Sequence, residues 1–158
     1  MKILVDSREQ RPLEFNHELI TETIRMPLPV GDYSCEFENG YQVPVVFERK
    51  TIGDLFSTLS QGYERFKREL GRAKDLDLKV ILIIDGSFSK VLKGYKHSQR
   101  NPLSIVRQVF MLWIKYDLYP VFCKNTDEMS LYIIEFYAAI GRKSLEDARE
   151  KAREQKEL

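Results

Sequence analysis

A run of charges within residues 46–54 (VFERKTIGD) offers the clearest chemistry in this sequence. Apolar residues lead into Glu48, Arg49 and Lys50, and a helix start follows at once. Side chains alternate between the two faces of an extended strand, so Glu48 and Lys50 share one face and Arg49 takes the other. A carboxylate beside an ammonium suits a site where the carboxylate holds a metal and the lysine positions or deprotonates a water. A strand end with solvated charges is the plain alternative.

Further acidic residues stand at expected strand ends and could converge on the same metal. With Glu48 they form the set Asp6, Asp32, Glu48 and Asp85. Magnesium prefers hard oxygen ligands and keeps several of its waters, so two or three carboxylates suffice to bind it. The two histidines, His17 and His97, are far from other ligands in the sequence, which argues against zinc. The sequence also has no glycine-rich loop of the kind that binds nucleotide phosphates.

These residues must be positioned by strands that alternate with helices. Strands are expected at 2–6, 33–37, 41–48, 78–84 and 119–123, and helices at 15–24, 51–74 with a break at Gly62, 102–116 and 126–140. The apolar run at 78–84 is typical of a central strand that is covered on both faces. The order predicts an α/β domain built on a mixed central sheet flanked by helices.

The hairpin between Asp32 and Glu48 decides whether these two acids can share a face. A plain two-residue turn at Asn39-Gly40 would point them to opposite faces of the sheet. A three-residue loop with Gly40 in a left-handed conformation would shift the pairing by one residue. A break at Pro44, which has no N–H to donate, would do the same. We therefore predict that this hairpin is not a plain two-residue one.

Asp54 allows two interpretations. Thr51 and Asp54 match the S/T-x-x-D/E pattern that caps a helix N-terminus, and a cap would fix the angle between strand and helix. Asp54 could instead act directly in the metal site. The sequence alone weights the two about equally.

Basic side chains gather in two segments that could follow a phosphate backbone. The candidates are Arg65, Arg68 and Arg72 on one face of an expected helix, and Lys93, Lys96 and Arg100 in the loop that follows residue 90. Each of these side chains could equally be solvated surface.

The bulk composition fits one globular domain. The chain has 158 residues, of which 43% are hydrophobic and 31% are charged, and its net charge of +1 neither requires nor excludes a nucleic-acid partner. Cys35 and Cys123 lack metal-ligand spacing and are expected to be reduced core residues. The N-terminus does not resemble a signal peptide, and no apolar run is long enough to span a membrane. We expect a protein of the cytoplasm, nucleoid or nucleus that is not secreted.

The expected globular unit covers residues 1–142. The segment 143–158 is dense in charge and nearly free of large apolar side chains. This pattern predicts a charged C-terminal helix or a linker.

A family resemblance follows from these motifs. Gly31-Asp32, Glu48-Arg49-Lys50 and Asp54 form the pattern G-D…E-R-K-x-x-x-D, which resembles that of the XPF-type excision-repair endonucleases, a branch of the PD-(D/E)XK superfamily. The similarity includes residues 6–9 and the LPVGDY segment, and it extends to about Arg142. The segment QGYERFKREL is most similar to compact, stand-alone relatives. The resemblance implies a restriction-endonuclease-like fold.

The resemblance also implies an activity. It implies a magnesium- or manganese-dependent endonuclease that cuts branched, flap or single-strand-containing DNA. Asp32 and Glu48 would be metal ligands with Asp6 close by, and Lys50 would orient or activate the water. Arg8, Arg49 and Asp54 complete the catalytic set that the family motif implies, the two arginines supporting the site or the phosphate.

The resemblance further implies a homodimer through the helices at 102–116 and 126–141, although a buried core would explain their apolar residues almost as well. Family members usually carry a tandem helix-hairpin-helix domain, and often a helicase domain, neither of which fits here. A separate partner could supply either one.

Two other kinds of function remain open. The chain could be a catalytically inactive subunit that binds DNA or dimerises, but the intact Glu48-Arg49-Lys50 argues against this. A purely structural interaction module would leave the acidic residues unexplained.

Overall fold

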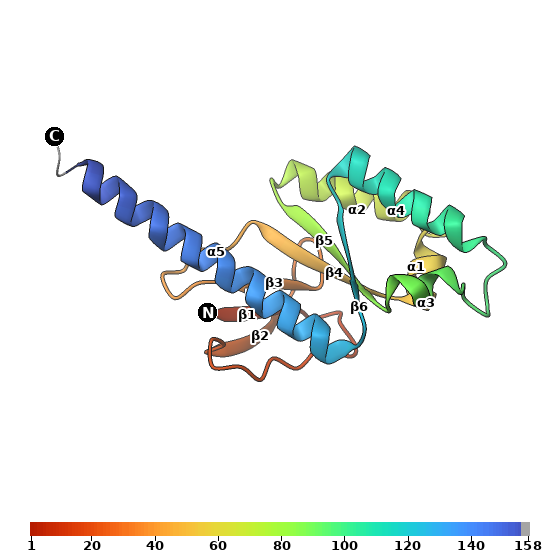
Figure 1. The fold of residues 1–158 in the computed structure, drawn as a ribbon, viewed down its shortest axis with the longest axis horizontal. Helices are drawn as coiled ribbons and strands as arrows, with labels where there is room; N and C mark the ends of the chain where they lie inside the picture. The colour runs from red at the N-terminus through yellow and green to blue at the C-terminus, as the bar shows by residue number, and fades with distance from the viewer. Residues whose placement is uncertain (156–158) are drawn as a thin grey trace.

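A six-stranded sheet runs through the centre of the molecule in the computed structural model, which describes residues 1–155 (Figure 1). Its strands are β1 (Lys2–Asp6), β2 (Glu22–Met26), β3 (Tyr33–Glu36), β4 (Val45–Thr51), β5 (Lys79–Asp85) and β6 (Tyr119–Cys123). They lie in the order β2-β1-β3-β4-β5-β6. β3 is antiparallel to β1 and to β4, and the other neighbouring strands are parallel. The predicted mixed α/β sheet is confirmed.

Helices cover both faces of the sheet. They are α1 (Ile52–Thr58), α2 (Tyr63–Asp75), α3 (Phe88–Leu92), α4 (Pro102–Tyr116) and α5 (Thr126–Glu154). α1, α2 and α4 lie over one face, and α5 crosses the other (Figure 1). β5 supplies Leu82 and Ile84 to the first apolar core and Ile81 and Ile83 to the second. The prediction that this strand is covered on both faces is confirmed.

The predicted helix at 15–24 is wrong. The structure forms β2 at its end instead, in parallel register with β1, so that Ile24 lies beside Leu4. Thr21, Thr23 and Ile24 are β-branched and therefore favour an extended backbone. The open edge of β1 supplies the hydrogen-bonding partner that local sequence cannot reveal.

The helical region after β4 is broken near Gly62, as expected. α1 ends at Thr58 and α2 begins at Tyr63. A Cβ at Gly62 would lie 3.1 Å from the Cα of Thr58, so only glycine fits this turn without a shift of the backbone. The turn aims α2 back across the end of β4.

α5 is longer than the predicted helix. It continues through residue 142 to Glu154, and its charged second half extends away from the sheet (Figure 1). Residues 156–158 of the predicted charged segment lie outside the described residues. Within residues 1–155, the helices are all too short or too polar to cross a membrane. Cys35 and Cys123 are buried and free, as predicted.

The turn of the hairpin is a three-residue loop. The N–H of Phe37 donates to the carbonyl oxygen of Tyr41 at 2.9 Å, which leaves residues 38–40 in the loop. Gly40 has φ +80°, the left-handed conformation that glycine adopts without strain. The prediction that this is not a plain two-residue hairpin is confirmed.

A second irregularity follows at Pro44. The N–H of Val43 donates to the carbonyl of Cys35, and two residues further along β3, Tyr33 pairs with Phe47. Between these two pairings the chain of β3 spans two residues, from Cys35 to Tyr33, and the facing chain spans four, from Val43 to Phe47. The two extra residues fall around Pro44, which cannot donate a ladder hydrogen bond. Because the number of extra residues is even, the side chains stay on the same faces of the sheet as the three-residue loop alone would give.

Candidate active site

A hollow of about 370 Å³ lies beside the ends of β1, β3 and β4 and under α2. We call it the acidic pocket. The sheet and its loops contribute Asp6, Arg8, Asp32, Glu48 and Lys50 to its lining, and α1 and α2 contribute Ser57, Thr58, Arg65, Phe66, Glu69 and Arg72. Five of the predicted site residues and two of the predicted basic residues therefore lie around one space.

The backbone holds Asp32 and Glu48 opposite each other. Since Tyr33 pairs with Phe47, the antiparallel register places Asp32 across from Glu48. The N–H of Asp32 donates to the carbonyl of Phe47 at 2.8 Å, and the N–H of Arg49 donates to Oδ2 of Asp32 at 2.8 Å. The predicted shared face for the two acids is confirmed.

Gly31 makes this close approach possible. Its φ is +78°, and a Cβ there would lie 3.0 Å from Cγ2 of Val46 and 3.1 Å from the carbonyl oxygen of Phe47. Any larger residue would push the chain away from β4. The glycine next to Asp32 is therefore needed for the position of the carboxylate.

Glu48 and Lys50 form an ion pair inside the pocket. The distance from Nζ of Lys50 to Oε1 of Glu48 is 2.9 Å, and the two side chains are 19% and 12% exposed, respectively. The ammonium also lies 5.8 Å from the centre of the Phe66 ring. The ion pair therefore lies against the apolar Phe66 ring, where water screens its charges poorly.

The pocket shifts the pKa of each of these groups. Burial and the charge of Glu48 raise the pKa of Asp32 to about 7. Burial also raises the pKa of Glu48, with Lys50 opposing the shift. For Lys50, burial acts to lower the pKa, but Glu48 outweighs it and the net shift is upward. Each of these adjacent carboxylates disfavours the ionised form of the other. A bound cation would stabilise both ionised forms.

Asp6 has other partners. Its Oδ2 accepts a bond from Nε of Arg8 at 2.7 Å, and its Oδ1 accepts from the N–H of Leu28 at 2.9 Å. The guanidinium of Arg8 also donates to the carbonyl of Leu28 at 3.0 Å. Both oxygens of this buried carboxylate therefore fix the Pro27–Pro29 segment and aim Arg8 at the pocket rim. To bind a metal, Asp6 would have to give up one of these bonds.

Arg49 lies on the opposite face of the sheet from the pocket, as alternation along β4 predicts. Its guanidinium donates to the carbonyl of Arg11 and lies 3.9 Å from Glu9 and 3.7 Å from Asp85. The side chain is only 12% exposed, and its buried Nε has no hydrogen-bond partner among residues 1–155. The structure therefore does not bring Arg49 or Asp85 to Glu48 and Lys50. It makes Arg49 a support beneath the strand that carries them.

Asp54 also lies outside the acidic pocket. Its N–H donates to Oγ1 of Thr51 at 3.1 Å, so the predicted helix cap is present. The Asp54 side chain is exposed and borders a separate hollow on the far side of α1. The structure does not bring Asp54 to the acidic pocket, because α1 turns it away, and a direct part in the metal site stays a prediction.

Glu69 is a pocket residue that the sequence analysis missed. It lies on the same helical face as Arg65 and Arg72, four residues after one and three before the other. The helical spacing that predicts a shared face for Arg65 and Arg72 also predicts that Glu69 lies on that face. Arg65 and Arg72 line the pocket with Glu69, whereas the exposed Arg68 does not.

The basic loop separates into two kinds of residue. Lys93 and Lys96 are exposed. Arg100 is instead held by four hydrogen bonds, to Leu59 O, Ser60 Oγ, Ser104 Oγ and Gln108 Oε1. The structure therefore holds Arg100 as a half-buried anchor, and its part in DNA binding stays a prediction. Its guanidinium fastens the loop to α1 and α4.

The donors of the acidic pocket fit a hard divalent cation. Within residues 1–155, no three histidine, cysteine or acidic side chains form a group that could enclose a metal ion. Magnesium needs no such cage, because it keeps several waters and is commonly held by one or two carboxylates. Asp32 and Glu48 supply two carboxylates of this kind, facing a hollow with room for water.

Comparison with known proteins agrees with these features. The family model described as "ERCC4 domain" matches residues 5–150. Two solved structures are similar: XPF from Aeropyrum pernix, with TM-score 0.67 and 22% identity over 95% of this chain, and XPF from Aeropyrum pernix in complex with DNA, with TM-score 0.64 and 24% identity over 90%.

The chain spans 69% and 66% of the lengths of those two chains. No curated protein sequence matches it. At these identities the structural likeness establishes the fold, and the family match, which covers nearly the whole chain, establishes the relationship. The chain belongs to the ERCC4-domain family and has the fold of the XPF proteins.

Proposed function

We propose that this chain is a divalent-metal-dependent DNA endonuclease that hydrolyses phosphodiester bonds in branched, flap or single-strand-containing DNA. The observation that carries the proposal is the placement of Asp32, Glu48 and Lys50 around one pocket whose rim holds arginines. Membership of the ERCC4-domain family supports it, as does the likeness to an XPF structure in complex with DNA.

Each pocket residue has a role that follows from its surroundings. Asp32 and Glu48 would hold Mg²⁺ or Mn²⁺, which supplies charge neutralisation at the phosphate and a more acidic water. Lys50, held by Glu48 at 2.9 Å and with its pKa shifted upward, would orient that water as a charged hydrogen-bond donor. Neither role requires Asp6, whose oxygens are already bonded.

The DNA backbone would approach across the rim of the pocket. Arg8, whose side chain is 70% exposed, stands on one side, and Arg65 and Arg72 of α2 stand on the other. Exposed guanidinium groups bind phosphate oxygens without regard to sequence. Such contacts would position a strand without selecting its bases. A separate DNA-binding or helicase partner would add affinity for a particular junction.

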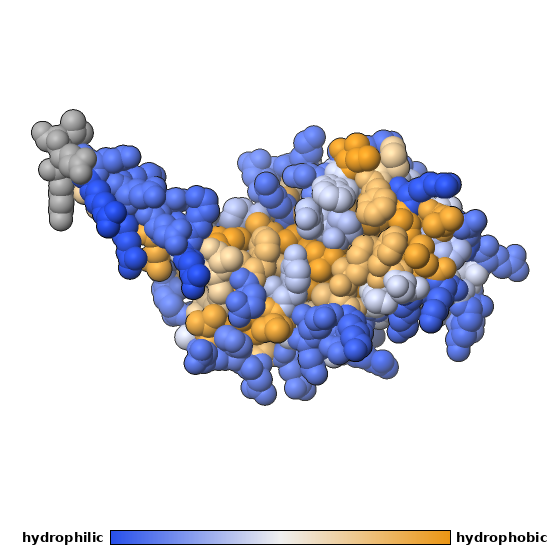
Figure 2. Space-filling model, viewed as in Figure 1, coloured by the Kyte–Doolittle hydropathy of each residue, from blue (hydrophilic) through white to orange (hydrophobic). Residues whose placement is uncertain are grey.

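A homodimer would form on the face that carries α4, β6 and the start of α5. Large apolar side chains are exposed there: Leu103, Phe110, Met111, Trp113, Ile114, Tyr119 and Leu131. Figure 2 shows apolar residues gathered in the middle of this face, whereas the projecting end of α5 is hydrophilic. Trp113 packs edge-on against Tyr119 with 4.9 Å between ring centres, which gives a rigid aromatic anchor. An exposed apolar patch of this size would be covered by a second copy in a two-fold pair.

Cleavage of a labelled flap substrate tests the activity. The wild-type chain should cut it with Mg²⁺ or Mn²⁺ and not with EDTA. Glu48→Gln and Lys50→Met should lower the rate by about two orders of magnitude or more, because each removes a group acting on the reacting atoms. Arg153→Gln, an exposed change on the projecting end of α5, away from both the pocket and the proposed dimer face, is the matched control.

Metal binding is measured separately from the cleavage activity. Mn²⁺ should raise the melting temperature of the wild type and not that of Asp32→Asn/Glu48→Gln, because ligand binding to the folded state alone stabilises it. If dimeric wild-type protein cuts no flap, splayed or nicked substrate with either metal, the nuclease assignment is wrong. The inactive DNA-binding subunit would then be the better account.

A further inference from the structure

A second hollow of about 450 Å³ lies beside the acidic pocket, on the other side of α1. We call it the side hollow. Ser57, Ser60 and Gln61 form one wall, and Tyr95, His97 and Ser98 of the loop before α4 form the other. Ser57 lines both hollows, so the end of α1 is their shared wall. A chain that leaves the acidic pocket over Ser57 enters the side hollow.

The loop wall of the side hollow is held rigidly. Arg100 ties the loop to the end of α1 through Leu59 and Ser60 and to α4 through Gln108. The N–H of Ser98 donates to the carbonyl of Tyr95 at 2.9 Å, closing a tight turn. The volume of the hollow falls within the range of preformed ligand sites. The contacts of Arg100 and Ser98 therefore form the side hollow without the help of a ligand.

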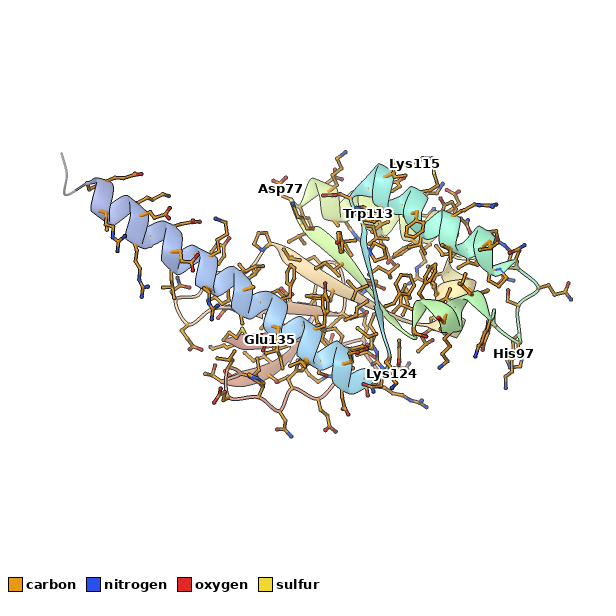
Figure 3. All side chains as sticks on the ribbon, in the orientation of Figure 1. Asp77, His97, Trp113, Lys115, Lys124 and Glu135 are labelled. Atoms are coloured by element: carbon orange, nitrogen blue, oxygen red, sulfur yellow. The ribbon has the colours of Figure 1, made fainter. Side chains whose placement is uncertain are left out.

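The aromatic groups of the loop are arranged for stacking. The ring of Tyr95 lies on Gly53, where a Cβ would be 2.9 Å from its Cζ, and its centre is 6.2 Å from that of Phe56. His97 stands edge-on to Tyr95 at 5.3 Å between ring centres and is itself exposed. Figure 3 shows His97 on the outlying loop that leads to α4. Tyr95 is thus fixed by packing, and the exposed His97 side chain lines the hollow where a planar ligand would enter.

We propose that the side hollow is a subsite for one unpaired nucleobase, next to the nucleotide whose phosphate lies in the acidic pocket. The base would stack on His97, as bases do on aromatic and imidazole rings. Asp54, which also borders the hollow, would accept two parallel hydrogen bonds from the ring N1–H and the exocyclic amino group of guanine, so guanine would bind better than adenine, cytosine or thymine. Lys93 and Lys96 would contact the backbone that continues along the loop.

This inference rests on the proposed nuclease function and gives Asp54 and His97 a part in it. Neither residue touches the reacting atoms, and both act on the placement of the strand. The subsite explains why a polar hollow lined by hydroxyl, amide and imidazole groups adjoins the acidic pocket. It also restricts productive binding to a strand whose base is free of its complement.

The test is a scan of an unpaired arm with single abasic positions. Each substrate is bound to the full-length wild type in Ca²⁺ with no Mg²⁺ or Mn²⁺, and affinity is measured by fluorescence anisotropy. One position near the cut should lose about tenfold in affinity, the size expected for one base–aromatic stack. At that position guanine should bind more tightly than adenine, cytosine or thymine. 2-Aminopurine placed there should lose fluorescence on binding.

His97→Ala supplies the decisive comparison. It should weaken binding of the intact arm about tenfold and leave binding of the abasic arm unchanged. The substitution and the abasic position each remove the same stacking contact. Asp54→Asn should reduce the difference between guanine and the other bases. Gln99→Ala, an exposed change in the same loop outside the hollow, should behave as wild type. Urea midpoints equal to the wild type's would show that each variant is folded.

The proposal is overturned if no abasic position matters more than its neighbours, or if the abasic penalty is the same in wild type and His97→Ala. Either result with active wild-type enzyme leaves the nuclease assignment standing. A wild type that binds with the expected abasic pattern but never cuts would overturn the nuclease assignment and keep the subsite.

Discussion

The backbone N–H of Arg49 donates to Oδ2 of Asp32 at 2.8 Å. Together with the bond from the N–H of Asp32 to the carbonyl of Phe47, it brackets Glu48 between two backbone contacts with the same aspartate. The separation of the two carboxyl groups is therefore set by the sheet and not by flexible side chains. A displacement of β4 would move both acids and the neighbouring lysine as a unit.

The crowding of Asp32 and Glu48 predicts a pH-dependent stability in the metal-free protein. The pKa of Asp32 is raised to about 7, so between its ordinary value of 3.8 and about 7 the folded chain holds a proton that the unfolded chain releases. Its contribution to stability is thus full below pH 3.8 and is lost as the pH rises through about 7. Asp32→Asn removes this titration while keeping an oxygen to accept the Arg49 amide.

Urea unfolding in EDTA measures the effect. Asp32→Asn should be more stable than wild type at about pH 8, by at most about 4 kcal/mol, and similar to it near pH 4. Equal differences at the two pH values would show that burial of this carboxylate does not oppose its ionisation.

Asp6 is predicted to act on the fold more than on the metal. Asp6→Ala leaves the Leu28 amide and the Arg8 guanidinium without their acceptor, which should lower the free energy of unfolding by about 2–3 kcal/mol. Mn²⁺ affinity, measured by calorimetry at a temperature where the variant is folded, should change much less than in Asp32→Ala. An equal loss of affinity in both variants would identify Asp6 as a ligand.

Arg49 is predicted to support β4 from behind. Arg49→Met leaves Glu9 and Asp85 without their cation and should destabilise the protein by about 2–4 kcal/mol in urea unfolding. Arg153→Met removes an exposed arginine on the projecting end of α5 and should stay within about 0.5 kcal/mol of wild type. Similar small effects in both would mean that the Arg49 cluster contributes nothing to stability.

Arg100 and Lys96 should differ although both are basic residues of one loop. Arg100→Ala removes four hydrogen bonds, so amide exchange across residues 95–104 should accelerate and the protein should lose about 1–3 kcal/mol of stability. Lys96→Ala should leave exchange unchanged and reduce the salt dependence of DNA binding. The reverse pattern would contradict the assignment of Arg100 as an anchor.

Ile114 is the most exposed large apolar residue of the proposed dimer face, at 78%. Ile114→Asp would place a charge in that interface and should weaken self-association at least about tenfold in sedimentation equilibrium. Leu19→Asp, an equally apolar-to-charged change at an exposed site in the segment before β2, is the control. A wild type that stays monomeric at high concentration would rule the dimer out.

Local sequence determined much of this protein. The apolar run of β5 and the alternation along β4 specify faces, because the side-chain period of a strand is two. They placed Glu48 with Lys50 and sent Arg49 to the other side, as the structure has it. The cap at Thr51 and the break at Gly62 were equally local, since each depends on residues within one turn.

Tertiary structure decided what depends on partners distant in the chain. β2 formed instead of a helix because the edge of β1 was open to it. Asp6, Asp54 and Arg100 each carried a charge that suited the predicted site, but the structure gives each of them other contacts. Asp6 accepts from Leu28, Asp54 lies in the first turn of α1 beside the side hollow, and Arg100 donates to Gln108 of α4. Glu69 entered the pocket because the turn at Gly62 folds α2 across β4. Sequence fixes which face a side chain takes, whereas only packing fixes which residues that face will meet.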